Sequence, residues 1–347
     1  MLSRVGRFAF HFGAILNMTC LGSAPERSGV EEFIFAGVQT RSFLDAYLLS
    51  GWHLDPYALA TVCPLVAFYW IGHARMLRTI GNPAVRAGYE RRSAAMIVAM
   101  FFLVVGLFSP VETWAMVYQW VHMIWHLDLM VAAPPFLILA DPWHEIRMGL
   151  PRAVDRALTL GYRRLAALPV AATAGRLLTS PWIAVVGFDA AMWGWHIPGP
   201  FDWAMASQAR MEIMMFSFFT TGMMMWYVAI DPNPNRRHEG PILRVFHMMI
   251  VSMSCMLLSV MLGLSSGPWY SAYNALMGTV RTLPLLADQQ IAAGILWVFG
   301  AVPWFIAGVV TLRDWLNDDE RGGADITDAF RVFTLRHVRS SAGSARY

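Results

Sequence analysis

Long apolar stretches, separated by short polar loops, recur along the chain. A helix needs about 20 predominantly apolar residues to cross a bilayer, and a window of about 19 residues identifies seven stretches of this kind. They are Ala58 to Met76, Ser93 to Val111, Ala115 to Leu139, Pro181 to Ile197, Met211 to Ile230, Leu243 to Leu264 and Ile291 to Leu312. The pattern predicts an all-α, polytopic transmembrane helical bundle with about seven spans.

The composition indicates a membrane protein and excludes a soluble domain. Of the 347 residues, 57% are hydrophobic and only 14% are charged, whereas soluble domains carry about 25% charged residues. The formal net charge is +3, but the hydropathy assigns the basic residues to a membrane surface rather than to a nucleic acid. Three cysteines, Cys20, Cys63 and Cys255, are too few and too scattered for a disulfide framework.

The loops predict the orientation, because arginine is retained on the cytoplasmic side of a membrane. The loops after the first, third and fifth stretches and the tail after the seventh hold most of the 26 basic residues. The opposite side holds only Arg27, Arg41, Arg210 and Arg281. We therefore expect the first stretch to enter from outside and the C-terminus to be cytoplasmic.

Three parts of the chain are expected. Residues 1–55 form an N-terminal segment, in which Arg4 and Arg7 precede an apolar stretch typical of a signal peptide. An uncleaved anchor or a short interfacial helix fits the same stretch. Residues 56–312 form the seven-span membrane domain, and residues 313–347 form a polar, cytoplasmic C-terminal tail.

A histidine pair in the third stretch is the first candidate for chemistry. His122 and His126 are one helical turn apart and project from the same face. An ionisable group inside a span usually faces a partner or a cavity, and two imidazoles one turn apart form half of a site for copper, zinc or iron. The alternative is a pair of histidines hydrogen-bonded to neighbouring helices.

Further donors fall at a similar depth once this orientation is applied. They are His53 before the first stretch, His196 at the outer end of the fourth, Met211 and Met215 in the fifth, and Asp288 and Gln289 at the seventh. Nitrogen and thioether donors together favour Cu(I), although we expect most of the 23 methionines to be packing residues. The donors predict a copper site in the outer half of the bundle.

Three motifs, in this order, carry a family resemblance. The first joins His122 and His126 to Ala133-Pro134-Pro135, the second is Trp195-His196-x-Pro198 followed by Phe201-Asp202, and the third is Asp288-Gln289 with Gly294 and Trp297. Over about residues 52–312 the chain resembles the CtaG-type cytochrome c oxidase assembly factors. The resemblance implies a bacterial plasma (inner) membrane protein that acts in the maturation of a caa-type oxidase. It also implies copper handling, with haem-copper oxidase subunits as partners.

One departure from the family pattern concerns the fifth stretch. Family members usually carry a second His-x-x-x-His pair there, where this chain has Met211 and Met215. The exchange of nitrogen for sulfur donors favours Cu(I) further, or the second site is lost.

Together these features predict a copper-binding, copper-delivery protein that is not an enzyme, since ligand exchange needs no bond-making chemistry. The expected primary ligands are His122 and His126, completed by His196 and by Met211 or Met215. Asp288 or Gln289 is expected to orient a histidine from outside the ligand set, and His53 to lie nearby. Two rivals stay open: a haem-binding membrane redox protein with an axial histidine, and a metal-free scaffold for oxidase subunits.

Overall fold

A computed structural model describes residue 52 and residues 56–230, 240–276 and 283–322. All regular elements in these ranges are helical, as the apolar pattern predicts. The predicted N-terminal segment, apart from Trp52, lies outside the described residues, and His53 lies outside them with it. The same holds for the tail beyond residue 322.

Each predicted apolar stretch coincides with one helix or one series of helices. Five stretches are single helices, namely α4 (Pro56–Thr79), α5 (Pro83–Phe108), α12 (Pro181–His196), α14 (Gln208–Ile230) and α15 (Pro241–Gly263). The third stretch comprises α6 (Val111–Ala115), α7 (Gln119–Leu127), the π-helix η1 (Asp128–Ala132) and α8 (Ala133–Ala140). The seventh comprises α16 (Leu285–Ile295), the π-helix η3 (Leu296–Ala301) and α17 (Val302–Gly322). Two of the seven predicted helices are therefore interrupted by π-helical turns.

Five helical segments in the described part are long and apolar enough to cross a membrane. They are Pro83–Phe108, Gln119–Ala140, Gln208–Ile230, Pro241–Gly263 and Leu285–Asn317. A sixth span results if α12 and the preceding α11 (Pro169–Leu178), which are bent by 70°, count as one. The protein is thus a membrane helical bundle with five or six candidate spans. Because α4 is not among them, the count of seven stays a prediction.

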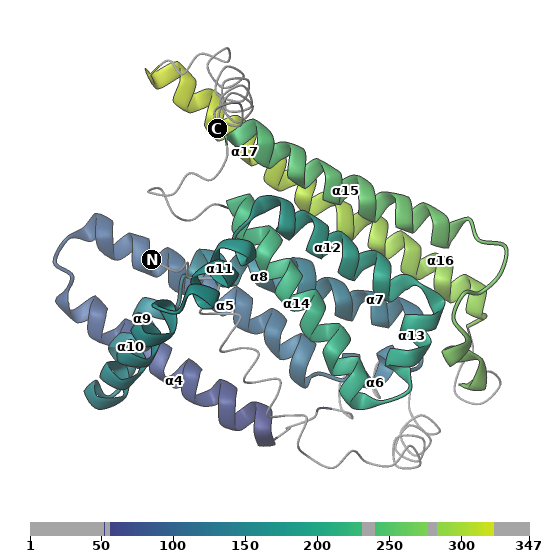
Figure 1. Cartoon of the computed structure of the whole chain (residues 1–347), viewed down its shortest axis with the longest axis horizontal. Helices are drawn as coiled ribbons and strands as arrows, with labels where there is room; N and C mark the ends of the chain where they lie inside the picture. The colour runs from purple at the N-terminus through teal and green to yellow at the C-terminus, as the bar shows by residue number, and fades with distance from the viewer. Residues whose placement is uncertain (1–51, 53–55, 231–239, 277–282, 323–347) are drawn as a thin grey trace, which may run out of the picture.

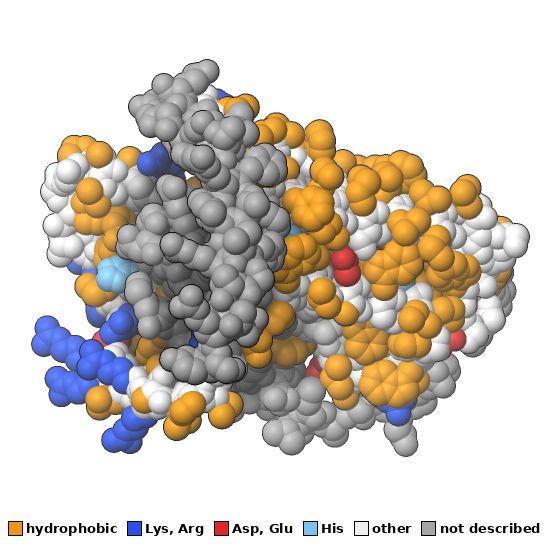
Figure 2. All heavy atoms as spheres, turned by 45° about the horizontal axis from the view of Figure 1, so that its top comes forward, with side chains coloured by type: hydrophobic (Ala, Val, Ile, Leu, Met, Phe, Trp, Pro, Cys, Tyr) orange, Lys and Arg blue, Asp and Glu red, His pale blue; other side chains and the backbone are white. Residues whose placement is uncertain are grey.

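The long helices lie alongside one another, and short helices lie at the two ends of the bundle (Figure 1). One end carries α6 and α13 (Pro198–Met205). The other end carries α9 (Trp143–Gly149) and α10 (Arg152–Ala166). Arginine side chains gather at this second end, while apolar side chains cover much of the remaining visible surface (Figure 2). Large exposed side chains such as Phe101, Val186 and Phe305 fit contact with lipid rather than with water.

Glycines allow two pairs of elements to meet backbone to backbone. A Cβ atom on Gly72 of α4 would lie 1.8 Å from the carbonyl oxygen of Glu145 in α9, and one on Gly149 would lie 1.8 Å from that of Phe68. In the centre of the bundle, a Cβ atom on Gly222 of α14 would lie 2.2 Å from the carbonyl oxygen of Met130. Small residues permit such close approach between helices in membranes, so these contacts fix how α9 and α14 pack.

The π-helix η1 directly precedes a proline pair, which removes a helical hydrogen bond from this part of the chain. Pro134 has no N–H group, so it cannot donate the usual helical hydrogen bond to the carbonyl of Met130. The backbone of Gly222 packs against this same carbonyl. π-Helical turns are frequent at functional sites, and η1 begins directly after the helix that carries His122 and His126.

Candidate metal centre

Three histidines from two helices form a cluster in the interior of the bundle. His122 and His126 lie on α7, and His196 is the last residue of α12. The ring centroids are 4.3 Å apart for His122 and His126, and 5.7 Å apart for His126 and His196. All three side chains are buried, with exposed fractions of 1%, 3% and 3%. The structure thus brings together the three histidines that the sequence places at similar depth.

Backbone carbonyls determine which ring nitrogens are free. Nδ1 of His122 lies 3.3 Å from the carbonyl oxygen of Ala115, and Nδ1 of His196 lies 2.6 Å from that of Met192. Because a carbonyl oxygen only accepts hydrogen bonds, each Nδ1 carries the hydrogen and each Nε2 is the nitrogen with a lone pair. Metal-bound histidines in proteins usually have their second nitrogen held in this way.

Buried nitrogens in the cluster lack partners among the described residues. Nε2 of His122 has none, and neither ring nitrogen of His126 has one. Leaving a buried polar atom unpaired costs about 1–3 kcal/mol, so native proteins keep few of them without a reason. The cluster therefore contains three ring nitrogens that no described residue occupies.

Aromatic rings surround the histidines. Phe218 of α14 packs against His126 with ring centroids 4.4 Å apart, and Phe201 of α13 packs against His122 at 5.0 Å. Phe218 also lies 6.4 Å from His196. Both phenylalanines are almost fully buried, so the cluster has a low-dielectric surrounding in which a bound cation would be shielded from water.

Two tyrosines cover the cluster from the end of the bundle that carries α13. The hydroxyl of Tyr270 donates to the carbonyl oxygen of His196 at 3.0 Å, and that of Tyr273 donates to the carbonyl oxygen of Ala115 at 3.1 Å. Burial, together with the nearby Asp202 carboxylate, raises the pKa of Tyr270, so its hydroxyl stays a donor at neutral pH. The Asp202 carboxylate also accepts the backbone N–H group of Ala272 at 3.1 Å. These bonds tie the loop before α16 to the cluster.

The two methionines predicted as ligands are buried on the α14 face that also carries Phe218. Met211 is 0% exposed and Met215 is 4% exposed. Phe218 contacts His126, and Gly222 contacts Met130. Because the second contact lies one turn further along in both segments, α7 and α14 run in the same direction here. Met215 lies about one turn before Phe218 along α14. Met211 lies a further turn away, which favours Met215 as the sulfur donor.

The predicted orienting residues act through the backbone. The Asp288 carboxylate accepts the N–H groups of Gln119 at 2.8 Å and Trp120 at 3.0 Å, which are the first two residues of α7. Gln289 accepts from the N–H group of Trp269 at 2.8 Å and donates to the carbonyl of Leu262 at 3.0 Å. In these bonds neither side chain orients an imidazole directly. The expectation that one of them orients a histidine stays a prediction.

The imidazole donors suit a metal ion by their chemistry, but the distances between the rings differ from those around a bound ion. No group of three or more His, Cys, Asp or Glu side chains in the described part of the chain is already arranged to hold a metal. Two imidazoles bound to one tetrahedral ion at about 2.0 Å have centroids roughly 5 Å apart. The observed separations of 4.3 Å and 5.7 Å lie on either side of this value.

Several residues important for this geometry were not singled out from the sequence as parts of the site. Ala115 holds His122 through its main chain, which no side-chain pattern reveals. Phe218 contacts two of the histidines, but it resembles any other apolar residue of α14 in the sequence. Phe201 belongs to a motif that carries the family resemblance, and Tyr270 and Tyr273 pack against its ring beside the cluster.

A comparison with protein families places this arrangement in context. The family model for the cytochrome c oxidase caa3 assembly factor matches residues 67–318, which include the whole histidine cluster. The chain belongs to the caa3 oxidase assembly factor family. The resemblance read from the three motifs is thereby confirmed. No curated protein and no solved structure matches the chain.

Proposed function

We propose that this caa3 oxidase assembly factor binds Cu(I) at His122, His126 and His196 and delivers it to an assembling oxidase. The observation that carries the proposal is the convergence of three buried imidazoles, of which His122 and His126 have ring nitrogens without a partner among the described residues. Histidines that served only for packing would be expected to have their polar atoms satisfied within the bundle. A cluster that holds open lone pairs in an apolar surrounding suits a cation that enters and leaves.

The donor set favours copper over harder metals. Imidazole nitrogen suits copper and zinc, and a thioether sulfur selects Cu(I). Met215 is buried on α14 about one turn before Phe218, which contacts His126, so it is the candidate sulfur donor. Calcium and magnesium require oxygen ligands, and the three rings of the cluster offer none.

The orientation follows from charge. The arginine-rich end with α9 and α10 is assigned to the cytoplasm of a bacterial plasma membrane, and the C-terminus with it. The histidine cluster is held by α6, α13 and the loop before α16, which puts it near the outer leaflet. Copper bound there would be accessible to an oxidase domain on the outer side.

The partners are subunits of a haem-copper oxidase, because the family is one of caa3 oxidase assembly factors. An assembly role agrees with the expectation that the protein is not an enzyme. Transfer of Cu(I) between ligands forms and breaks only coordination bonds. This chain's part would be to bind the ion, keep water out and orient the three imidazoles.

Metal analysis of the detergent-purified protein after anaerobic Cu(I) loading tests the proposal. We expect about one copper per chain in the wild type and its loss in the His122→Ala/His126→Ala double variant. The matched control is His144→Ala, which removes an exposed histidine at the other end of the bundle and should keep the copper. A wild type that takes up no Cu(I) would overturn the proposal and favour the metal-free scaffold.

The haem alternative is distinguished in the same preparation by its absorption spectrum. A Soret band in the wild type, lost in the double variant, would favour a haem protein. The packing argues against that result, because Phe201 and Phe218 lie directly against the histidine rings. A porphyrin would have to displace both phenylalanines to reach an axial nitrogen.

A further inference from the structure

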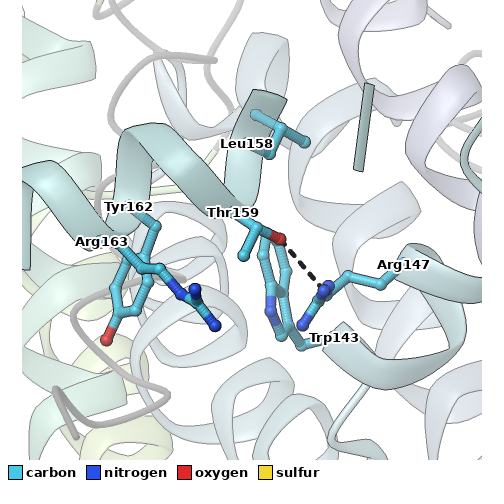
Figure 3. Close-up of a pocket in the computed structure, with 6 residues that line it drawn as sticks. All are labelled: Trp143, Arg147, Leu158, Thr159, Tyr162 and Arg163. Atoms are coloured by element: carbon cyan, nitrogen blue, oxygen red, sulfur yellow. Dashed lines mark hydrogen bonds between the residues drawn. The ribbon is translucent and has the colours of Figure 1, made fainter. Parts of the chain in front are cut away.

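A small pocket lies between α9 and α10, at the end of the molecule opposite the histidine cluster. Its volume is about 190 Å³, and it is lined by Trp143, Arg147, Leu158, Thr159, Tyr162 and Arg163 (Figure 3). Two guanidinium groups border it from different helices, with the indole ring of Trp143 between them (Figure 3). Cationic and aromatic groups that converge on one concave surface are typical of a binding site for an anion.

Arg147 is held in place by α10. Its Nε donates to Asp155 at 2.6 Å, and one terminal nitrogen donates to Asp155 at 3.2 Å and to Thr159 at 3.1 Å. Arg163, by contrast, is exposed and forms no ion pair with a described residue. The pocket therefore has one fixed guanidinium, whose charge Asp155 offsets, and one free guanidinium. The remaining positive charge is available to a ligand.

The two faces of α10 show where this pocket lies relative to a membrane. Val154, Leu158, Tyr162 and Leu165 recur at spacings of four, four and three residues and share one face, whereas Arg152, Arg156 and Arg163 share the opposite face. No residue of α10 is fully buried, so no core formed by the described residues covers its apolar face. An amphipathic helix of this kind lies in the membrane interface, with its basic face toward water.

The pocket is at the boundary between these two faces. Leu158 and Tyr162 belong to the apolar face, Arg163 belongs to the basic face, and Thr159 lies between them. In an interfacial helix this boundary is at the level of the lipid phosphates. Tryptophan and tyrosine, both present here, are also enriched at that level.

We propose that this pocket binds the phosphodiester headgroup of an anionic phospholipid, with Arg163 as the main electrostatic contact. Arg147 and the Thr159 hydroxyl border the same volume and add hydrogen-bond donors. The apolar face of α10 contacts the acyl chains of the same leaflet. Basic pockets beside transmembrane helices recognise headgroups by this combination of charge and apolar contact. The lipid thereby anchors α10 and α9, and α9 packs backbone to backbone on α4.

The test is a titration of the purified full-length protein with phosphatidylglycerol, followed by native mass spectrometry. We expect Arg163→Gln to raise the dissociation constant of the bound lipid about tenfold, because the variant loses a charge-assisted hydrogen bond to the phosphate that only a residue of the pocket can form. Arg164→Gln is the matched control, since it removes the same charge from the neighbouring exposed position outside the pocket. The control should leave the affinity unchanged. Both substitutions are at exposed positions, and equal circular dichroism spectra would verify that folding is intact.

Three results would overturn the proposal. Equal binding of phosphatidylcholine, which is zwitterionic, would show that the net negative charge of the lipid does not determine binding. Equal weakening by Arg163→Gln and Arg164→Gln would indicate diffuse attraction instead of a pocket. Displacement of the lipid by low millimolar inorganic phosphate would assign the pocket to a soluble anion. None of these readouts involves copper, so they are independent of the function proposed above.

Discussion

The carboxylate of Asp288 accepts the backbone N–H group of Gln119 at 2.8 Å, and so a residue of α16 caps the first turn of α7. The residue before this turn, Tyr118, contributes no side-chain hydrogen bond to the cap. The first N–H groups of a helix have no partner within the helix. A negative charge at this end also interacts favourably with the positive end of the helix dipole. Asp288 thus positions the helix that carries His122 and His126.

Removing this cap should loosen α7 without touching a histidine. We expect Asp288→Ala to lower the free energy of unfolding by about 0.5–2 kcal/mol, and Asp288→Asn by less, because an amide oxygen still accepts one hydrogen bond. Unfolding by denaturant in detergent measures both values. Gln290→Ala is the control, since its side chain is exposed and its bond to Gly263 is long, at 3.5 Å. Equal stability of Asp288→Ala and the wild type would contradict the capping role.

Substitution of His126 distinguishes a role as a metal ligand from a role in packing. Both of its ring nitrogens are buried without a partner among the described residues, and such atoms cost about 1–3 kcal/mol each in mutational series. We therefore expect His126→Leu to abolish Cu(I) binding and to raise the thermal midpoint of the metal-free protein. The same substitution at the exposed His144 should change neither quantity. A lower midpoint for His126→Leu would mean that the imidazole stabilises the bundle.

The sequence predicts how deep each candidate donor lies in the membrane better than it predicts which residues surround that donor. Counting residues from the outer ends of the spans placed His126 and His196 at similar depth, and the rings lie 5.7 Å apart. The count could not distinguish Met211 from Met215, because that choice depends on the register between α7 and α14. This register is set by a glycine, Gly222, against a carbonyl oxygen.

Features built from the backbone were not predictable from side-chain patterns. The π-helix at Asp128–Ala132 changes the phase of the third stretch, and only the following proline pair hints at it. The contact of α9 with α4 depends on Gly72 and Gly149, which are ordinary loop or helix residues in the sequence. The Asp288 carboxylate, which the sequence predicts to orient a histidine, accepts hydrogen bonds from two main-chain N–H groups.

The contact between Gly222 and Met130 predicts the effect of adding one methyl group. A Cβ atom at position 222 would lie 2.2 Å from the Met130 carbonyl oxygen, so Gly222→Ala must push α14 away from η1. We expect a loss of about 1–3 kcal/mol of stability, typical of overpacking, together with weaker Cu(I) binding because Phe218 moves with α14.

Gly194→Ala provides the comparison for this substitution. Nothing lies within 4 Å of a Cβ atom at Gly194, which is also inside a helix. Alanine is the better helix former by about 1 kcal/mol, so this variant should be at least as stable as the wild type. Thermal unfolding and a Cu(I) competition titration on both variants measure the two effects. The register argument fails if Gly222→Ala behaves as Gly194→Ala does.

The ion pair between Arg147 and Asp155 predicts how the attachment of α10 to α9 depends on pH. The hydrogen bond from Arg147 lowers the pKa of Asp155 below its ordinary value of 3.8. A carboxyl group with a lowered pKa in the folded state stabilises that state above its ordinary pKa and loses this contribution as the pH falls through the lowered value. The attachment should therefore be complete at neutral pH and weaken only below about pH 4.

Pulsed electron paramagnetic resonance measures this attachment as a distance. Spin labels at the exposed positions Met148 of α9 and Leu160 of α10, in a background without the native cysteines, should give a narrow distance distribution at pH 6 and a broader one at pH 3. Asp155→Asn should be broad at both values, because its amide cannot carry the charge that Arg147 pairs with. A wild-type distribution that does not change between pH 6 and pH 3 would mean that the ion pair does not hold the two helices together, and that the shape of the pocket depends on other contacts.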